Sequence, residues 1–221
     1  YGRQLQKELA GLAIKTITIG FDQASDWQLA KQDEHNFYLI KADQKYLIRH
    51  YLLGDFQIYN LAFSLVGLVN LGFKLADLIP LCQKLSPVTG RFESFEIASK
   101  QALAIVDFAH TPDALEQALK HLRGRHPSIL TVIIGCGGER DHGKRKLMAE
   151  IAQKHADKII ITDDNPRFED PEKIRAEIMQ YCQAEEIAER RQAIIKALQQ
   201  AKPGEIILIA GKGHENYQIY R

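Results

Sequence analysis

Cysteine is scarce in this sequence, and its cysteines lie far apart. Only Cys82, Cys136 and Cys182 occur among the 221 residues, and no two of them form a CxxC pair. An odd number of widely separated cysteines argues against a disulfide framework and against a thiolate metal site. We therefore expect reduced thiols, as in a cytosolic protein, and we predict no metal site.

Long apolar runs and a one-sided charge are also missing. No hydrophobic stretch approaches the about 20 residues of a transmembrane helix, and no secretory signal pattern is visible. The formal net charge is only +1, so an extended nucleic-acid-binding surface is not expected. We thus expect a cytoplasmic protein with no nucleic-acid or membrane partner. The sequence also lacks four common motifs. Without GxSxG and HExxH, standard serine hydrolases and zincins are not supported, and without Walker A and GxGxxG, a P-loop and a Rossmann dinucleotide-binding loop are not supported.

Hydrophobic residues nevertheless make up 45% of the chain, enough for a sizeable core. The first part contains short strand-like runs followed by two helical patterns, at residues 16–20, 37–40, 46–51, 58–69 and 75–85. Gly72 suits the end of the first helical pattern. Ser86-Pro87 interrupts the second pattern, so we predict two domains, residues 1–86 and 87–221.

The second part alternates between β-branched apolar runs and helical patterns. The four runs are LAIVDFAH, ILTVIIGCG, KIIITDDN and EIILIAGKG. The helical patterns cover residues 112–122, 146–155, 171–182 and 186–201. Alternating strands and helices indicate βαβ units and a parallel sheet. The predicted fold class is α/β, with a Rossmann-like, mostly parallel C-terminal domain after an α+β region.

Polar residues follow each of these four strands. In such sheets, ligands bind beyond the carboxyl ends of the strands. The four ends carry DFAH (107–110), GCGG (135–138), DDNPR (163–167) and GKGHE (211–215). One polar end is typical of any loop, whereas four on the same edge favour a binding site.

Helix starts explain part of this polarity. Thr111 suits an N-cap position and Pro112 the first helical position, and Asp170 and Pro171 repeat the pattern. These residues therefore need no functional explanation.

Other strand-end residues are left unexplained by helix starts. Asp107 suits a ribose hydroxyl and His110 suits a nucleotide, although each alone is more often a turn residue or a satisfied histidine. Asn165 offers a donor and an acceptor, and Arg167 offers a rigid cationic fork. Together these two suit a zwitterion that carries an extra carboxylate, and Glu215 suits its ammonium group.

The segment GCGGERDHGKRK combines glycines with charge. Glycines let a backbone approach a ligand closely, and Arg140 suits a carboxylate. A flexible loop with a solvated basic run explains the glycines equally well.

Seven segments in this order resemble the Mur ligase family, most closely its tripeptide-forming MurE type. They are GDFQIYN, PVTGRFESF, DFAHTPDALEQAL, GCGGERDHGKRKLM, DDNPRFEDP, ERRQAI and AGKGHENYQ. The resemblance implies an ATP-dependent, amide-forming ligase of peptidoglycan precursor synthesis, with ATP and Mg²⁺ as cofactors. Such a ligase adds meso-diaminopimelate to the UDP-MurNAc-dipeptide UDP-MurNAc-L-Ala-D-Glu through an acyl phosphate.

The resemblance also implies roles for individual residues. The nucleotide-binding residues are expected to be Asn60, Arg91, Asp107 and His110. The residues that bind the incoming amino acid are expected to be Arg140, Asp164, Asn165, Arg167, Gly211 and Glu215. DNPR resembles the form that selects meso-diaminopimelate over L-lysine. Two positions depart from the family pattern: Gln57 replaces an asparagine, and Phe108 replaces a tyrosine.

A larger departure concerns the start of the chain. The family's ATP phosphate loop, carbamylated lysine and UDP-sugar domain should precede Tyr1, together with the catalytic groups. We therefore expect residues 1–86 to be the end of the central ATP-binding domain and residues 87–221 to be the C-terminal ligase domain. We expect this chain alone not to ligate.

Several alternatives remain open on the sequence. The close alternatives are an L-lysine-adding ligase, another Mur-type ligase and a folylpolyglutamate synthetase, although the DNPR and GKGHE segments favour the tripeptide-forming type. A non-catalytic module that binds a nucleotide or an amino acid belongs to a different class.

Overall fold

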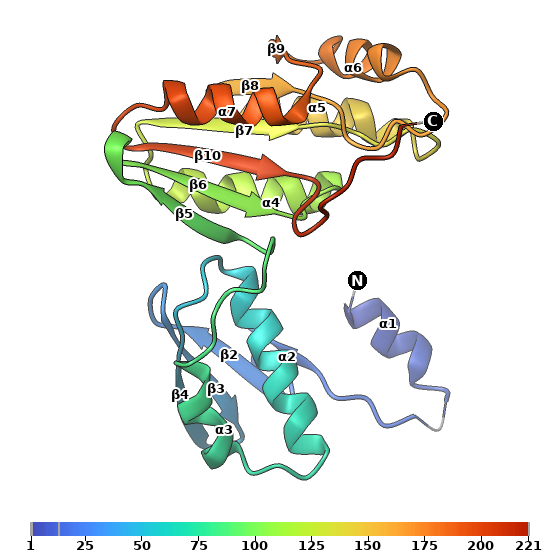
Figure 1. Cartoon of the computed structure of the whole chain (residues 1–221). Coiled ribbons are helices and arrows are strands. Elements are labelled where there is room, and N and C mark those ends of the chain that lie inside the picture. Colours follow the sequence, from blue (N-terminus) through green and yellow to red (C-terminus); the bar gives the residue numbers. More distant parts are fainter. Residues whose placement is uncertain (1, 13, 221) are drawn as a thin grey trace. The chain divides into compact units, whose positions relative to one another are not determined.

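The computed structural model describes residues 2–12 and 14–220, and the chain divides into two compact units, Tyr1–Ser86 and Pro87–Arg221. Each unit has secondary structure and a core of its own (Figure 1). No helix within the described ranges has both the length and the apolar character needed to cross a membrane.

Within residues 2–12 and 14–86, the first unit contains a four-stranded sheet and three helices. In sheet order the strands are β1 (Ile19–Gly20), β2 (Trp27–Lys31), β3 (Asn36–Lys41) and β4 (Gln44–Arg49), and the helices are α1 (Gly2–Leu9), α2 (Phe56–Asn70) and α3 (Leu75–Cys82). β1 and β2 are parallel, and β2, β3 and β4 are antiparallel. Alternate residues of β2 and β3 face the core, where Trp27, Phe37 and Leu39 are buried with the apolar side of α2.

The sequence predicted this unit only in part. The strands around residues 37–40 and 46–51 and both later helices are confirmed, and α2 ends before Gly72, which has a φ of 98°. The strand predicted at 16–20 shrinks to Ile19–Gly20, and β2 and α1 were missed. β2 has only two inward apolar side chains, and α1 is mostly exposed and polar, so neither carries a clear periodic signal.

The second unit is built on a six-stranded sheet in the order β5-β6-β10-β7-β8-β9. The strands are β5 (Glu93–Ile97), β6 (Ala102–Asp107), β7 (Ile129–Ile134), β8 (Lys158–Ile161), β9 (Glu185–Glu186) and β10 (Glu205–Ala210). Only β5 runs antiparallel to its neighbour. Every residue of the central β10 is buried. The predicted α/β fold with a mostly parallel sheet is confirmed.

Helices cover both faces of this sheet. They are α4 (Pro112–Gly124), α5 (Gly143–His155), α6 (Pro171–Met179) and α7 (Arg190–Gln200), with a short 3₁₀ turn, η1, at Ala98–Lys100. α7 lies on one face, and α4 and α5 lie on the other (Figure 1). The prediction that the last helix begins at residue 186 was wrong, because Glu185–Glu186 pairs with β8 and Glu189 caps the helix that starts at Arg190.

Two helix starts follow the predicted capping chemistry. The Thr111 hydroxyl accepts from the Ala114 N–H at 3.3 Å, and the Asp170 carboxylate accepts from the Glu172 N–H at 3.0 Å. Pro112 and Pro171 occupy the first helical positions. These four residues therefore have an architectural role.

Candidate functional site

The strand register brings the four polar ends to one edge of the second unit. Ala210 pairs with Asp107, Ile209 pairs with Ile133, and Ile134 pairs with Ile161. The next residue of each strand thus emerges at the same carboxyl edge. Nine of the ten residues predicted for the site belong to this unit, and Asn60 lies on α2 of the other unit.

The side chain of Asp107 accepts hydrogen bonds from the backbone of two neighbouring segments at this edge. Its two carboxylate oxygens accept from the N–H of Phe92 at 2.8 Å and from the N–H of Ala109 at 3.0 Å. Burial raises the pKa of Asp107 above its ordinary value, and these backbone donors oppose the rise. The carboxylate therefore shapes the strand end, and its predicted contact with a ribose stays a prediction.

Beside Asp107, cationic and aromatic groups share a small surface. The guanidinium carbon of Arg91 lies 4.3 Å from the centre of the Phe108 ring, and the His110 ring lies 4.6 Å from that centre. Nδ1 of His110 lies 2.8 Å from the carbonyl oxygen of Phe108. Arg91 and His110 are thereby brought together around the phenylalanine that replaces the expected tyrosine.

Two glycines join this surface to the end of β10. Gly90 and Gly213 have φ values of 68° and 49°. A Cβ on Gly90 would lie 2.2 Å from the carbonyl carbon of Gly213, so no side chain fits there. The segment before β5 and the segment after β10 therefore touch through their backbones.

On the other side of the edge, Asn165 is the centre of a buried polar network. Its Oδ1 accepts from Nζ of Lys212 at 3.0 Å and from the Ile219 N–H at 2.9 Å. Its Nδ2 donates to Oε2 of Glu215 at 3.3 Å. Asn165 is 6% exposed and Lys212 is 7% exposed, so the network is held in a fixed geometry.

Lys212 also sets the charge state of Glu215. Its Nζ donates to Oε2 of Glu215 at 3.0 Å. Burial opposes ionisation of Glu215, but the hydrogen bond and charge of Lys212, with the Asn165 amide, keep the pKa of Glu215 below its ordinary value. The sequence did not single out Lys212, because a lysine between two glycines after a strand is usually solvated.

Arg167 is fixed by one of its nitrogens. Nη1 donates to the carbonyl oxygens of Gly138 at 2.9 Å and of Asn165 at 3.2 Å. Among the described residues, none accepts a hydrogen bond from Nε or Nη2. The φ of Arg167 is 55°, a left-handed conformation, and its N–H donates to the Ile219 carbonyl at 3.0 Å. Arg140 is exposed and makes no hydrogen bond or ion pair with the described residues.

Asp164 and Gly211 meet at the end of β10. A Cβ on Gly211, whose φ is 111°, would lie 3.3 Å from Oδ2 of Asp164. Beneath them, the buried Arg190 donates from Nη2 to the Ala210 carbonyl at 2.7 Å. Burial lowers the pKa of Arg190, and the charge of Asp164 opposes that effect. Arg190 was another residue that the sequence did not single out.

The end of the described chain folds back onto the DNPR segment. Nε2 of Gln218 donates to the carbonyl oxygens of Asp163 and Asp164 at 3.0 and 2.9 Å. The Tyr220 hydroxyl donates to Asp163 at 3.0 Å, and Arg175 also pairs with that carboxylate. Burial and the Asp163 carboxylate raise the pKa of Tyr220 to about 12. Residues far apart in sequence therefore hold this segment in place.

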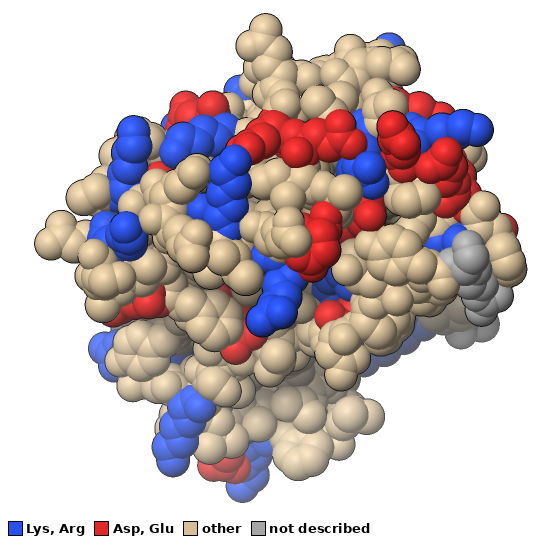
Figure 2. All heavy atoms as spheres, turned by 45° about the horizontal axis from the view of Figure 1, so that its top comes forward, with Lys and Arg blue, Asp and Glu red and all other residues tan. Residues whose placement is uncertain are grey.

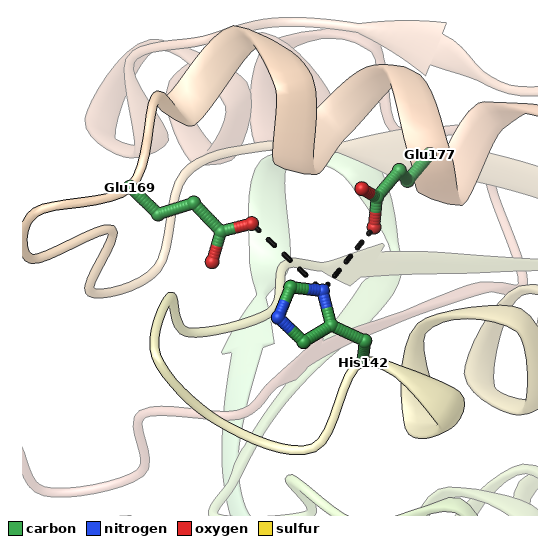
Figure 3. Close-up of side chains that lie close together, drawn as sticks. All are labelled: His142, Glu169 and Glu177. Atoms are coloured by element: carbon green, nitrogen blue, oxygen red, sulfur yellow. Dashed lines mark ion pairs between the residues drawn. The ribbon is translucent and has the colours of Figure 1, made fainter.

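A histidine and two glutamates lie close together near the start of α5. The ligand atoms of His142, Glu169 and Glu177 lie within 4.8 Å of one another, and the three side chains point toward one another (Figure 3). These residue types bind divalent cations. However, the buried guanidinium of Arg145 donates to both carboxylates. A cation is already present in the group, so the arrangement does not fit a resident metal.

Charged residues of both signs share the surface. On the face shown in Figure 2, lysines and arginines lie among acidic side chains, some of which form a band. This face has no broad basic area of the kind that binds nucleic acid.

Comparison with known proteins relates this chain to a family of ligases. The family profile described as Mur ligase, glutamate ligase domain, matches residues 90–213. A UDP-N-acetylmuramoyl-L-alanyl-D-glutamate--2,6-diaminopimelate ligase from Vibrio parahaemolyticus is 48% identical over 172 residues, which are 76% of this chain and 35% of that protein. The protein of the same name from Rickettsia prowazekii is 43% identical over 215 residues, 93% of this chain and 44% of that protein. The chain thus spans less than half the length of these curated relatives.

Solved structures agree with this result. A structure of a UDP-N-acetylmuramoyl-L-alanyl-D-glutamate--2,6-diaminopimelate ligase matches 99% of this chain and 47% of that chain, with 37% identity and a TM-score of 0.59. A bifunctional folylpolyglutamate synthase/dihydrofolate synthase from Yersinia pestis, complexed with AMPPNP and Mn ion, matches 96% of this chain and 48% of that chain. It has a TM-score of 0.73 and 15% identity, which shows a shared fold alone. Because the family profile covers more than half of the 221 residues, the chain belongs to the Mur ligase family.

Proposed function

We propose that this chain is the carboxyl-terminal part of an ATP-dependent ligase that adds meso-diaminopimelate to UDP-MurNAc-L-Ala-D-Glu in peptidoglycan precursor synthesis. The proposal is carried by the opposed charges around Asn165 in a chain that is 43–48% identical to proteins named as diaminopimelate ligases. Glu215 accepts from the side-chain amide of Asn165, and Arg167 donates to the backbone carbonyl of Asn165, so an anion and a cationic fork both contact this residue. A substrate with ammonium and carboxylate groups at both ends matches that pattern.

The second carboxylate of diaminopimelate distinguishes it from lysine. Nε and Nη2 of Arg167 have no hydrogen-bond acceptor in the described part of the protein. Arg167 contacts Gly138, and the exposed Arg140 follows Gly138 by two residues in the sequence. Guanidinium groups bind carboxylates through paired hydrogen bonds. Oε1 of Glu215 accepts no hydrogen bond from a described residue, so it suits an ammonium group. Lysine, which lacks the second carboxylate, would leave a guanidinium unpaired.

The proposed reaction joins a carboxylate and an amine. The carboxylate of UDP-MurNAc-L-Ala-D-Glu would take the γ-phosphoryl group of ATP to form an acyl phosphate, with ADP as the leaving group. The amine of the amino acid would then attack the acyl carbon, and phosphate and a proton leave as the amide forms. In this chain, the pocket around Asn165 would orient the amine, because positioning a nucleophile contributes strongly to rate. We propose nucleotide contacts for Arg91, Asp107 and His110 of the second unit, and we retain the nucleotide contact expected for Asn60 of the first unit as a separate proposal.

The cofactors and the location follow from the same proposal. ATP is the expected nucleotide, with Mg²⁺ to offset its phosphate charge, and the Yersinia pestis fold relative was solved with AMPPNP and Mn ion. The carboxylates of Asp107 and Glu169 already accept hydrogen bonds within the chain, so we propose neither of them as a ligand of Mg²⁺. A reaction that consumes ATP and a UDP-linked precursor belongs in the cytoplasm.

The test uses the full-length protein with meso-diaminopimelate or L-lysine, and an Arg167→Ala variant of it. We expect the wild-type protein to prefer diaminopimelate. Hydrogen bonds to a charged group contribute about 1.5–3 kcal/mol, so Arg167→Ala should lower kcat/KM for diaminopimelate about 10- to 100-fold and leave the KM for ATP nearly unchanged.

Arg191→Ala is the matched control, because Arg191 is exposed on α7 and lies outside the proposed pocket. It should behave as the wild type does. A wild-type preference for lysine would contradict the proposed substrate. An equal loss of diaminopimelate use and ATP binding in Arg167→Ala would contradict the role of Arg167.

A further inference from the structure

Two loops carry the arginines of the proposed amino-acid pocket. The glycine loop, residues 135–141, contains Arg140, and the DNPR loop, residues 162–170, contains Arg167. They follow the adjacent parallel strands β7 and β8. Because each loop supplies one cation, the separation between the loops decides whether both cations can bind one substrate.

Backbone contacts hold the glycine loop and the DNPR loop close together. The Gly138 N–H donates to the Asn165 carbonyl at 2.9 Å. A Cβ on Gly138 would lie only 2.0 Å from the carbonyl oxygen of Pro166, and a Cβ on Gly135 would lie 2.3 Å from that of Thr162. The loops are therefore as close as two backbones can pack, and only glycine fits at these positions.

An ion pair between the buried Arg145 and the half-buried Glu169 also holds the loops. Arg145, on the first turns of α5, donates from Nη1 to Oε1 of Glu169 and from Nη2 to Oε2 of Glu169, each at 2.7 Å. The side chain of Arg145 is 2% exposed. A two-nitrogen pair of this kind fixes orientation as well as distance.

Glu169 connects this pair to both loops. It belongs to the DNPR loop, and its Oε2 also accepts from the Glu139 N–H of the glycine loop at 3.2 Å. Glu139 is the residue before Arg140, and its φ of 52° is left-handed. One carboxylate thus binds the segment that carries Arg167, the backbone next to Arg140, and the start of α5.

Glu177 provides an internal comparison. It accepts from Nη1 of Arg145 at 2.6 Å, but it lies on α6 and makes no hydrogen bond to either loop among the described residues. His142 lies 4.0 Å from Glu169 and 3.9 Å from Glu177 (Figure 3). Both glutamates therefore neutralise Arg145, whereas only Glu169 joins the two loops.

We propose that Arg145 and Glu169 are positioning residues that hold Arg140 and Arg167 at the separation at which diaminopimelate binds. The pair touches no substrate and acts through the loops. This inference rests on the proposed function, because it assigns the two loops to one amino-acid substrate. It makes substrate affinity depend on a partly buried ion pair outside the pocket.

The test compares Glu169→Gln with Glu177→Gln in the full-length protein. Each variant removes one negative charge next to Arg145 and keeps the shape of the side chain. Misplacement of binding groups by an ångström can cost up to about 100-fold, so we expect the KM for diaminopimelate to rise about tenfold or more in Glu169→Gln. The KM for ATP should stay within about twofold of the wild-type value, since no nucleotide-side group is displaced. Glu177→Gln should keep a near-wild-type KM for diaminopimelate.

Arg145→Lys is the second variant. Lysine keeps the charge but not the planar fork, so it should raise the KM for diaminopimelate as Glu169→Gln does. Hydrogen exchange should also become faster at the Gly138 and Glu139 amides in Glu169→Gln and not in Glu177→Gln. This measurement needs no substrate.

The outcomes separate the two proposals. Wild-type protein that joins no diaminopimelate contradicts the proposed function. If the wild type does join it, an unchanged KM for diaminopimelate in both Glu169→Gln and Arg145→Lys overturns the positioning role. Equal rises in Glu169→Gln and Glu177→Gln, or an equal rise in the KM for ATP, also overturn it.

Discussion

The buried ammonium group of Lys212 donates hydrogen bonds to two residues of the candidate pocket. It donates to Oδ1 of Asn165 and to Oε2 of Glu215, both at 3.0 Å. A buried cation stabilises an adjacent carboxylate in its charged form. The anion that we assign to the substrate ammonium group therefore depends on a second residue that contacts it from within the protein.

Replacing Lys212 with methionine should shift the pH dependence of the proposed reaction. Lys212 helps to hold the pKa of Glu215 below its ordinary value, so its removal raises that pKa. Glu215 would then become protonated, and lose its attraction for an ammonium group, at a higher pH than in the wild type. The acidic limb of kcat/KM for diaminopimelate should move to higher pH. Steady-state rates of the full-length protein across the acidic range measure this shift.

Lys146→Met is the control for this prediction. Lys146 is exposed on α5 and pairs with Glu150, so its loss should leave the acidic limb in place. An acidic limb at the same pH in Lys212→Met and in the wild type would show that Lys212 does not govern Glu215.

At the scale of the elements, the central strands were predictable and the edges were not. Four of the five parallel strands, β6, β7, β8 and β10, are apolar runs because both faces of the sheet are covered. β5 is an exposed antiparallel edge strand and β9 has two residues, so neither leaves a strong pattern. The side-chain pairs of the site could not be predicted from local sequence either, because the partners are far apart in the chain. Lys212 and Asn165 are 47 residues apart, and Arg145 and Glu169 are 24 apart.

The capping residues were predictable for the opposite reason. Thr111 and Asp170 bond to N–H groups two or three residues later, so a short stretch of sequence contains the whole interaction. The positions of Asp107 and His110 at one edge followed from the strand order, whereas their partners did not. Interactions between residues that are close in sequence can be predicted from the sequence, whereas contacts between residues on different strands can be identified only once the fold is known.

The close packing of the two loops leads to a prediction about Gly138. An alanine Cβ there would lie 2.0 Å from the Pro166 carbonyl oxygen and 2.9 Å from Cβ of Glu169. The loops must separate to admit it, and overpacking of this kind costs about 1–3 kcal/mol. Gly138→Ala should therefore lower the free energy of unfolding by about that amount and raise the KM for diaminopimelate about tenfold. Urea unfolding and steady-state kinetics measure the two effects.

Gly124→Ala is the matched control, because a Cβ on Gly124 would meet no atom within 4 Å. Alanine at the end of α4 should be neutral or slightly stabilising. If Gly138→Ala matched this control in both measurements, the contact between the loops would not limit their positions.

At the scale of the whole molecule, the chain consists of two units with separate cores. The first unit contains the sole tryptophan of the sequence, Trp27, which is 4% exposed within its core. The second unit is built around β10, and its core on the α7 side includes Ile207 and Ala193. Tryptophan emission therefore reports on the first unit alone, whereas circular dichroism reports on both.

A buried histidine should make the first unit sensitive to acid. His50 is 1% exposed. Burial lowers its pKa most, the neighbouring His35 adds to the effect, and Asp33 and Glu34 oppose it. In the unfolded chain, His50 takes up a proton at about pH 6.5, while the folded chain still excludes it. The unfolded state then binds more protons, so the stability of the first unit falls as the pH drops through about 6.5 toward the lower pKa of the folded state.

Urea unfolding followed by Trp27 emission at neutral pH and at mildly acidic pH measures this loss. The midpoint should fall on acidification in the wild type, and it should fall less in His50→Leu, which cannot take up the proton. His126→Asn is the control in the second unit, because His126 is exposed and asparagine tolerates its φ of 53°. This control should keep the wild-type response. Equal acid sensitivity in His50→Leu and in the wild type would assign the loss to other groups of the first unit. If the urea midpoint falls on acidification in the wild type and in His126→Asn, and does not fall in His50→Leu, then protonation of His50 is what destabilises the core around Trp27.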